Sequence, residues 1–178
     1  MTNTEPTNSS YRIFEGKILS LRVDTVALPN GMQAKREIIE HGPAVAVVPV
    51  DDMDNVYMVR QYRKAIDDFL LEIPAGRMDS GENPEVAAHR ELGEETGLET
   101  RNLEFLGRYF TTPGFTDEEM YAYLAKDLVK GEPHPDEDEN VEVVVLPFET
   151  VVGMVRGGEI RDGKSIAGLL MAWDRLHS

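Results

Sequence analysis

The chain has 178 residues and a mass of 19.9 kDa, and its 41% hydrophobic and 29% charged residues are typical of one ordinary globular domain. A formal net charge of −15 argues against a protein that tracks nucleic-acid phosphates through a basic face. The sequence contains no run of about eighteen uncharged apolar residues, which a membrane helix would need. The absence of cysteine excludes disulfides, thiolate metal sites and cysteine nucleophiles. We therefore expect a soluble protein in a reducing compartment, the cytoplasm.

The N-terminal region predicts a polar tail followed by a β-hairpin. Residues 1–10 lack the basic start and the apolar stretch of a signal peptide, so we expect a disordered tail before a single domain over residues 11–178. Extended stretches lie between Ile13 and Leu28, Pro29-Asn30-Gly31 is a strong turn signal, and Gln33 to Glu40 returns as a strand. Residues 11–43 thus form the predicted hairpin region.

The remaining chain predicts a mixed α/β order. Apolar or alternating runs predict strands at Ala44–Val50, Val56–Arg63, Phe69–Ile73, Leu103–Thr111, Tyr121–Ala125 and Val141–Leu146. Helical patterns occupy about Pro84–Glu95, Phe148–Arg156 and Ser165–Leu176. The antiparallel hairpins and the missing strand-helix alternation argue against a doubly wound parallel sheet.

The segment from Gly76 to Leu98 carries clear helix signals. Asn83 is a good N-cap, Pro84 suits the first helical position, and Gly97 is well placed to end the helix in a left-handed conformation. Gly93 in the helix interior costs roughly 1 kcal/mol relative to alanine, so we expect another chain segment to approach closely there.

This predicted helix also stacks acidic residues. Glu91 and Glu95 lie one above the other on one face, with Glu94 close by, and Arg90 is the obvious local counter-charge. Like charges at this spacing repel, whereas a divalent cation would make the arrangement favourable, because hard cations such as Mg²⁺ prefer carboxylate oxygens and are often completed by substrate phosphates. Taken alone, a solvated acidic face explains the same pattern.

The complete segment from Gly76 to Leu98 resembles the Nudix box, a motif that specifies residues at fixed spacing from a first glycine to a final aliphatic residue. The matching positions are Gly76, Glu82, Arg90, Glu91, Leu92, Glu94, Glu95, Gly97 and Leu98. The resemblance implies a Nudix α/β/α sandwich with a mixed sheet, here with an added N-terminal antiparallel β-hairpin region. It also implies hydrolysis of a nucleoside diphosphate linked to another group.

The flanking sequence is similar to the ADP-ribose pyrophosphatase branch of that family, which includes nucleoside diphosphate sugar hydrolases. The similar stretches are Arg60–Arg63, Leu71–Gly76, Pro113–Glu118, Asp136–Val145 and Gly158–Ser165. This likeness implies ADP-ribose or a related sugar nucleotide as substrate. It further implies a homodimer in which the N-terminal region is exchanged between subunits.

Metal roles follow from the resemblance alone. It implies that Glu91 and Glu95 are the principal Mg²⁺ ligands, with Mn²⁺ as a substitute, that Glu94 supports them, and that the Ala75 carbonyl completes the coordination. Arg90 is expected to orient a box carboxylate rather than contact substrate. Glu82 is expected in the outer part of the site.

The same likeness implies a catalytic base on a loop outside the box. Glu137 is the favoured base and Glu139 an added metal ligand, although coupled carboxylates near a metal can share the proton-accepting role. A solvated acidic loop is the alternative for both residues.

Substrate contacts are predicted at several further positions. Arg63 is the candidate for the diphosphate, because a guanidinium forks onto phosphate oxygens, with a surface salt bridge as the alternative. Glu118 resembles the residue that reaches the terminal sugar, and Glu72 is a polar neighbour. The loop residues Pro113, Gly114 and Phe115 match the branch, and either Tyr11 or Phe14 is expected to stack on adenine or to belong to the core.

Three other functions compete with this interpretation. A hydrolase of nucleoside triphosphates or dinucleoside polyphosphates would share the box without needing Pro113 and its neighbours. An isomerase of isopentenyl diphosphate normally uses a catalytic cysteine, which this chain lacks. A regulatory module that binds ADP-ribose without cutting it would not need the intact carboxylate set.

Overall fold

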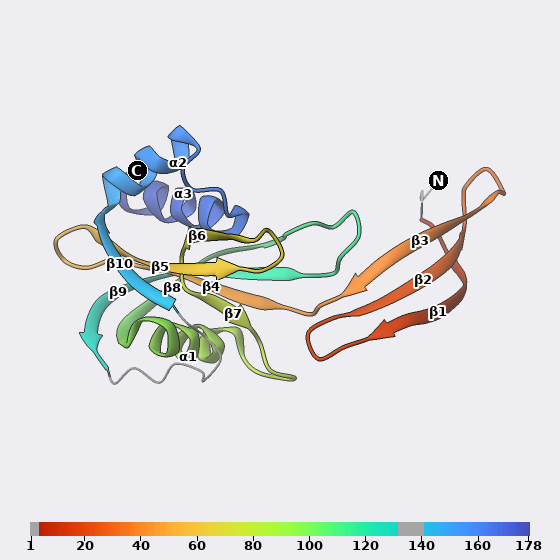
Figure 1. Cartoon of the computed structure of the whole chain (residues 1–178), viewed down its shortest axis with the longest axis horizontal. Coiled ribbons are helices and arrows are strands. Elements are labelled where there is room, and N and C mark those ends of the chain that lie inside the picture. Colours follow the sequence, from red (N-terminus) through yellow and green to blue (C-terminus); the bar gives the residue numbers. More distant parts are fainter. Residues whose placement is uncertain (1–3, 132–140) are drawn as a thin grey trace. The chain divides into compact units, whose positions relative to one another are not determined.

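The computed structural model describes residues 4–131 and 141–178, and their contacts divide into two compact units (Figure 1). The first unit is the chain up to Pro43 together with Phe110–Glu119. The second unit consists of Ala44–Tyr109 and Met120–Ser178.

The first unit contains a three-stranded antiparallel sheet. Its strands are β1 (Thr7–Glu15), β2 (Ser20–Ala27) and β3 (Gln33–Glu40), in the order β1-β2-β3. The predicted turn between β2 and β3 is confirmed: Gly31 has φ 82°, and the Leu28 amide donates to the Met32 carbonyl at 2.8 Å. Glycine adopts this left-handed conformation without a steric penalty.

Strand β1 extends the expected hairpin on its N-terminal side. It starts at Thr7, so Thr7–Ser10 pair with β2, although the sequence places them in the tail. All nine residues of β1 are exposed. The strand is therefore held mainly by backbone hydrogen bonds, which leave little hydrophobic signal in the sequence.

The segment Phe110–Glu119 belongs to this first unit as well. The Ile39 amide donates to the Phe115 carbonyl at 2.7 Å, and the Asp117 amide donates to the Ile39 carbonyl at 3.3 Å. The Asp117 carboxylate also accepts from the His41 amide at 2.8 Å. The loop with Pro113, Gly114 and Phe115 is thus attached to the end of β3.

The described residues of the second unit form two sheets and three helices. Its strands are β4 (Ala44–Pro49), β5 (Asn55–Arg63), β6 (Asp68–Glu72), β7 (Ala75–Arg77), β8 (Leu98–Phe110), β9 (Glu119–Lys130) and β10 (Val141–Pro147). Their orders are β7-β4-β9-β8 and β10-β5-β6. The helices are α1 (Pro84–Thr96), α2 (Phe148–Gly157) and α3 (Gly163–His177). Strand β4 runs parallel to β9 and antiparallel to β7, which makes the first of these sheets mixed.

Side chains of β4 point alternately into two hydrophobic layers. Ala46 and Val48 pack with residues of α2 and α3, whereas Val45 and Val47 pack with residues of α1. Figure 1 shows α1 on one side of the strands and α2 with α3 on the other. A strand covered on both faces has an apolar run instead of an alternating one, and this arrangement confirms the predicted α/β/α sandwich.

The predicted helices agree with the structure to within two residues at each end. Strand β7 was not predicted, because a three-residue strand containing glycine lacks a recognisable pattern. In the parts of the chain that the structure describes, no helix is long and apolar enough to cross a membrane.

Candidate active site

Helix α1 forms with the predicted end signals. The Asn83 side chain accepts a hydrogen bond from the Glu85 amide at 2.8 Å, Pro84 opens the helix, and Gly97 ends it with φ 67°. Among the described residues, a Cβ on Gly93 would meet the Leu98 carbonyl oxygen at 3.8 Å, an ordinary van der Waals distance, so these residues do not make the predicted close approach.

Two carboxylates of α1 are buried against β7. Glu91 is 7% exposed and Glu95 is 5% exposed. A Cβ on Gly76 would lie 2.1 Å from the Glu91 carboxylate, so the missing side chain at Gly76 is the space that this carboxylate occupies. The Ala75 amide donates to Glu95 Oε2 at 3.1 Å. The pairing of β7 with β4 therefore brings Ala75 and Gly76 to the two predicted metal-binding glutamates.

Arg90 provides the positive charge among these carboxylates. Its Nη1 lies 2.7 Å from Glu91 and 2.9 Å from Glu94, and its Nη2 lies 3.1 Å from Glu82 and donates to the Arg77 carbonyl. Hydrogen bonds from Arg90 and from the Asp79 amide lower the pKa of Glu82 below its ordinary value. Arg90 thus contacts three box carboxylates and helps to hold them in place, and the orienting role predicted for it stays a prediction.

The oxygen atoms of the predicted ligands Glu91, Glu94, Glu95 and Ala75 suit a hard divalent cation. They do not form a complete metal site in the part of the chain that the structure describes. Within residues 4–131 and 141–178, no three carboxylate or imidazole groups converge as a metal site. Among the box carboxylates, Arg90 contacts Glu91 and Glu94, and the Ala75 amide donates to Glu95. Carboxylate and carbonyl oxygens are the ligands that Mg²⁺ prefers. The predicted base Glu137 and ligand Glu139 lie outside the described residues.

A further buried carboxylate belongs to Glu72 at the end of β6. Its side chain is 1% exposed and accepts two hydrogen bonds from Arg63, from Nε and from Nη2, each at 2.7 Å. Lys164 also forms an ion pair with it. The guanidinium fork that was predicted for a diphosphate is thus used, at Nε and Nη2, to hold Glu72.

The charges around Glu72 shift its ionisation. Burial favours the neutral acid, but the hydrogen bonds from Arg63 and the charge of Lys164 outweigh it, so the pKa of Glu72 lies below its ordinary value. The Glu72 hydrogen bond in turn raises the pKa of Arg63, and Glu95 contributes to the same shift. Sequence reasoning missed Lys164, whose only signal was its place in the branch-like stretch Gly158–Ser165.

This depressed pKa predicts a pH-dependent effect of Glu72→Gln. At pH 7 we expect the variant to lose about 2 kcal/mol of unfolding free energy, less than a fully buried pair would lose because Arg63 is 40% exposed. The stabilisation by ionised Glu72 is complete above the unfolded carboxyl pKa of about 4.3 and is lost as pH falls through the lower folded pKa. Urea unfolding of both proteins at neutral and acidic pH measures the difference, which would be constant if Glu72 contributed only packing.

The other predicted substrate residues lie in the first unit. Glu118 accepts a hydrogen bond from the Thr111 hydroxyl at 2.5 Å and lies 3.4 Å from His41 Nδ1. Tyr11 and Phe14 are 51% and 54% exposed, so the alternative that they are core residues is wrong. Phe115 is 51% exposed in its loop, where Pro113 and Gly114 are also exposed. Their substrate contacts stay predictions.

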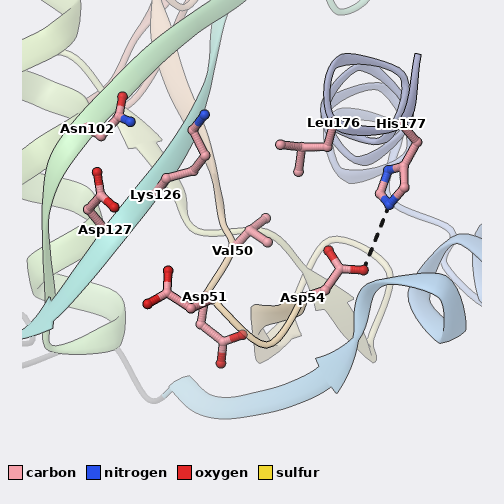
Figure 2. Close-up of a pocket in the computed structure, with 9 residues that line it drawn as sticks. Val50, Asp51, Asp54, Asn102, Lys126, Asp127, Leu176 and His177 are labelled. Carbon is pink, nitrogen blue, oxygen red and sulfur yellow. Dashed lines mark ion pairs between the residues drawn. The ribbon is translucent and has the colours of Figure 1, made fainter.

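A pocket of about 350 Å³ lies elsewhere in the second unit (Figure 2). It is lined by residues that include Asp51, Asp54, Lys126 and His177, and Asp54 lies 3.9 Å from the His177 ring. None of the predicted site residues lines it. We therefore place the candidate active site at α1 and β7.

The fold and the α1 glutamates define the class to which this protein belongs. Residues 40–169 match the NUDIX domain family. The chain therefore belongs to the Nudix family, which confirms the resemblance that the box predicts. Hydrolases of this family act with a divalent metal.

Similar proteins indicate the branch more narrowly. The ADP-ribose pyrophosphatase of Bacillus subtilis is 42% identical over 163 residues, which cover 90% of this chain and 88% of that protein. The methanol dehydrogenase activator of Bacillus methanolicus is 42% identical over 164 residues, which cover 91% of this chain and 89% of that protein. A crystal structure of an ADP compounds hydrolase shares the fold, with a TM-score of 0.87, 22% identity, and coverage of 97% of this chain and 94% of that one. The predicted similarity to the ADP-ribose pyrophosphatase branch is confirmed.

Proposed function

We propose that this protein hydrolyses the diphosphate bond of ADP-ribose, giving AMP and ribose 5-phosphate, or the equivalent bond of a related nucleoside diphosphate sugar. The observation that carries the proposal is the buried pair Glu91 and Glu95, held against Ala75 and Gly76. The identity to the ADP-ribose pyrophosphatase of Bacillus subtilis supports this substrate class.

The residues of this chain would bind and orient the reacting groups. Glu91, Glu95, Glu94 and the Ala75 carbonyl would hold Mg²⁺, with Mn²⁺ as a substitute. When bound, the cation supplies Lewis-acid polarisation of the diphosphate and helps to generate a nucleophilic water. Arg90 fixes the directions of Glu91 and Glu94 through its two short ion pairs.

Glu137 is proposed as the base that accepts the proton of the attacking water. Glu139, two positions later in the sequence, is proposed as a metal ligand. Glu137→Gln should remove most turnover, by about tenfold to a hundredfold, because general-base catalysis contributes at least that much and Glu139 can share the role. Metal binding should remain nearly intact, since the substituted residue is not a proposed ligand. Unchanged kcat in steady-state assays would remove Glu137 from the mechanism, and Glu139→Gln provides the comparison.

A homodimer is proposed through the first unit. Strand β1 lies at the edge of its sheet and exposes Tyr11, Ile13 and Phe14, each by about half of its surface. An edge strand with exposed apolar side chains is a ready site for association with another chain. Light scattering should give twice the chain mass, and a monomer would contradict a site shared between subunits. A cytoplasmic location stays a prediction from the cysteine-free sequence.

Turnover measurements test the proposed reaction. ADP-ribose should be cleaved to AMP and ribose 5-phosphate with Mg²⁺ and not with a chelator, alongside assays of ADP-glucose, GDP-mannose and a nucleoside triphosphate. Selective cleavage of another compound would keep the metal-binding helix and discard ADP-ribose. Tight binding of ADP-ribose without cleavage of any diphosphate would instead identify a binding module.

A further inference from the structure

Four consecutive residues, Ile73–Gly76, comprise the connection from β6 to β7 and the first two residues of β7, and we call this segment the strap. Every residue of the strap has a specific neighbour. The Ile73 amide donates to the Ser165 hydroxyl at 2.8 Å, and the Pro74 carbonyl accepts from the Val47 amide at 2.8 Å. The Ala75 amide donates to Glu95, and Gly76 leaves the space filled by the Glu91 carboxylate. The strap therefore sets the position of both buried carboxylates.

Ser165 is the contact farthest from the strap in sequence. It lies in the first turn of α3 and is fully buried. Its hydroxyl donates to Asp162 Oδ2 at 2.5 Å, and its amide donates to the same oxygen at 2.9 Å. The single hydrogen of the hydroxyl is donated to Asp162, so a lone pair of the oxygen remains to accept the hydrogen bond from the Ile73 amide. The direction of the Ser165 hydroxyl is thus determined by the helix cap.

The same helix turn also holds the residue that precedes the strap. Lys164 forms ion pairs with Glu72 and, at 3.0 Å, with Asp162. Glu72 and Ile73 are buried, with 1% and 0% exposure, so water does not replace these contacts. An amide left without an acceptor in such a place carries a desolvation cost, and a small movement of the strap is the available relaxation.

We propose that Ser165 is a positioning residue for the cation site, acting through the strap on Ala75 and Glu95. The inference rests on the proposed function, because it assumes that these residues hold a divalent cation. It adds a residue on α3, outside the box, that would affect cation binding while contacting neither the cation nor the substrate. Outer-shell partners of ligands typically change metal affinity by about 10- to 100-fold when they are removed, and Ser165 acts one contact farther away.

Mn²⁺ binding to the cation-free protein, measured from the electron paramagnetic resonance signal of free Mn²⁺, tests the proposal without relying on activity. Ser165→Ala should raise the Kd for Mn²⁺ by about tenfold, and Ser165→Thr, which keeps the hydroxyl, should restore most of the affinity. Val152→Ala is the matched control, since it weakens the same core cluster from α2 and removes no hydrogen bond of the strap. It should lower the melting temperature and leave the Kd unchanged.

Defined outcomes overturn the proposal. Wild-type affinity in Ser165→Ala would do so, as would equal weakening in Val152→Ala, because general destabilisation would then explain the loss. If Ser165→Ala does not fold, Asp162→Ala removes the acceptor that fixes the direction of the Ser165 hydroxyl but keeps that hydroxyl, and wild-type Mn²⁺ affinity in that variant would overturn the proposal. Failure of the wild-type protein to bind Mn²⁺ and to cleave any diphosphate would instead reject the proposed function.

Discussion

Gly76→Ala is expected to lower kcat/KM for ADP-ribose by about a hundredfold or more while the protein stays folded. The added Cβ would lie 2.1 Å from the Cδ and Oε1 atoms of Glu91, so that carboxylate must move. The displaced group is the end of a flexible side chain, and we expect a change in unfolding free energy of no more than about 1 kcal/mol. A misplaced metal ligand, in contrast, reduces the several kcal/mol by which a bound metal stabilises the transition state. A loss of about 1.4 kcal/mol of this stabilisation corresponds to a tenfold lower rate.

Gly153→Ala is the matched control for this substitution. Gly153 lies inside α2, and a Cβ there meets no atom of the described residues within 4 Å. Alanine is favoured over glycine in helices by roughly 1 kcal/mol, so this variant should unfold at a higher denaturant concentration and keep its activity. Steady-state kinetics and urea unfolding of the two variants separate the effects. Wild-type kcat/KM in Gly76→Ala would show that the Glu91 carboxylate does not need its present position.

Glu95→Gln should abolish most metal-dependent turnover, again by about a hundredfold or more, without weakening the fold. The amide oxygen of glutamine can still accept from the Ala75 amide, which now donates to Glu95 at 3.1 Å. Loss of the charge also relieves repulsion from Glu91, four residues earlier on the same face, by a few tenths of a kcal/mol. Because the charge of Glu95 also attracts Arg63, whose pKa it raises, the two effects oppose each other and the melting temperature without added cation should change little.

Glu85→Gln provides the comparison on the same helix. Glu85 is exposed in the first turn of α1, where its charge interacts with the helix dipole by roughly 0.3–1 kcal/mol. This variant should keep its turnover and its response to Mg²⁺. A Glu95→Gln protein that retains full Mg²⁺-dependent activity would exclude Glu95 as a principal ligand and shift the metal site away from the buried face of α1.

Local signals were sufficient to predict helix α1 and the direction of its acidic residues. Asn83, Pro84 and Gly97 act within one turn of their own positions, so their effect depends little on the rest of the chain. The burial of Glu91 and Glu95 on one face follows from their spacing of four residues. The strand β7 escaped prediction because its three residues gain their structure from pairing with β4.

The residues of the candidate site also divide into those determined by neighbours along the chain and those determined by tertiary contacts. By itself, the sequence determined the box, its helix, the charge that Arg90 supplies and the α/β/α class of the second unit. Only the tertiary structure decided that Gly76 makes room for Glu91, that Arg63 holds Glu72, and that Lys164 and Ser165 contact residues 92 positions away. Helix caps and side-chain spacing act through neighbours along the chain, whereas these contacts depend on which strands pair and which helix covers them.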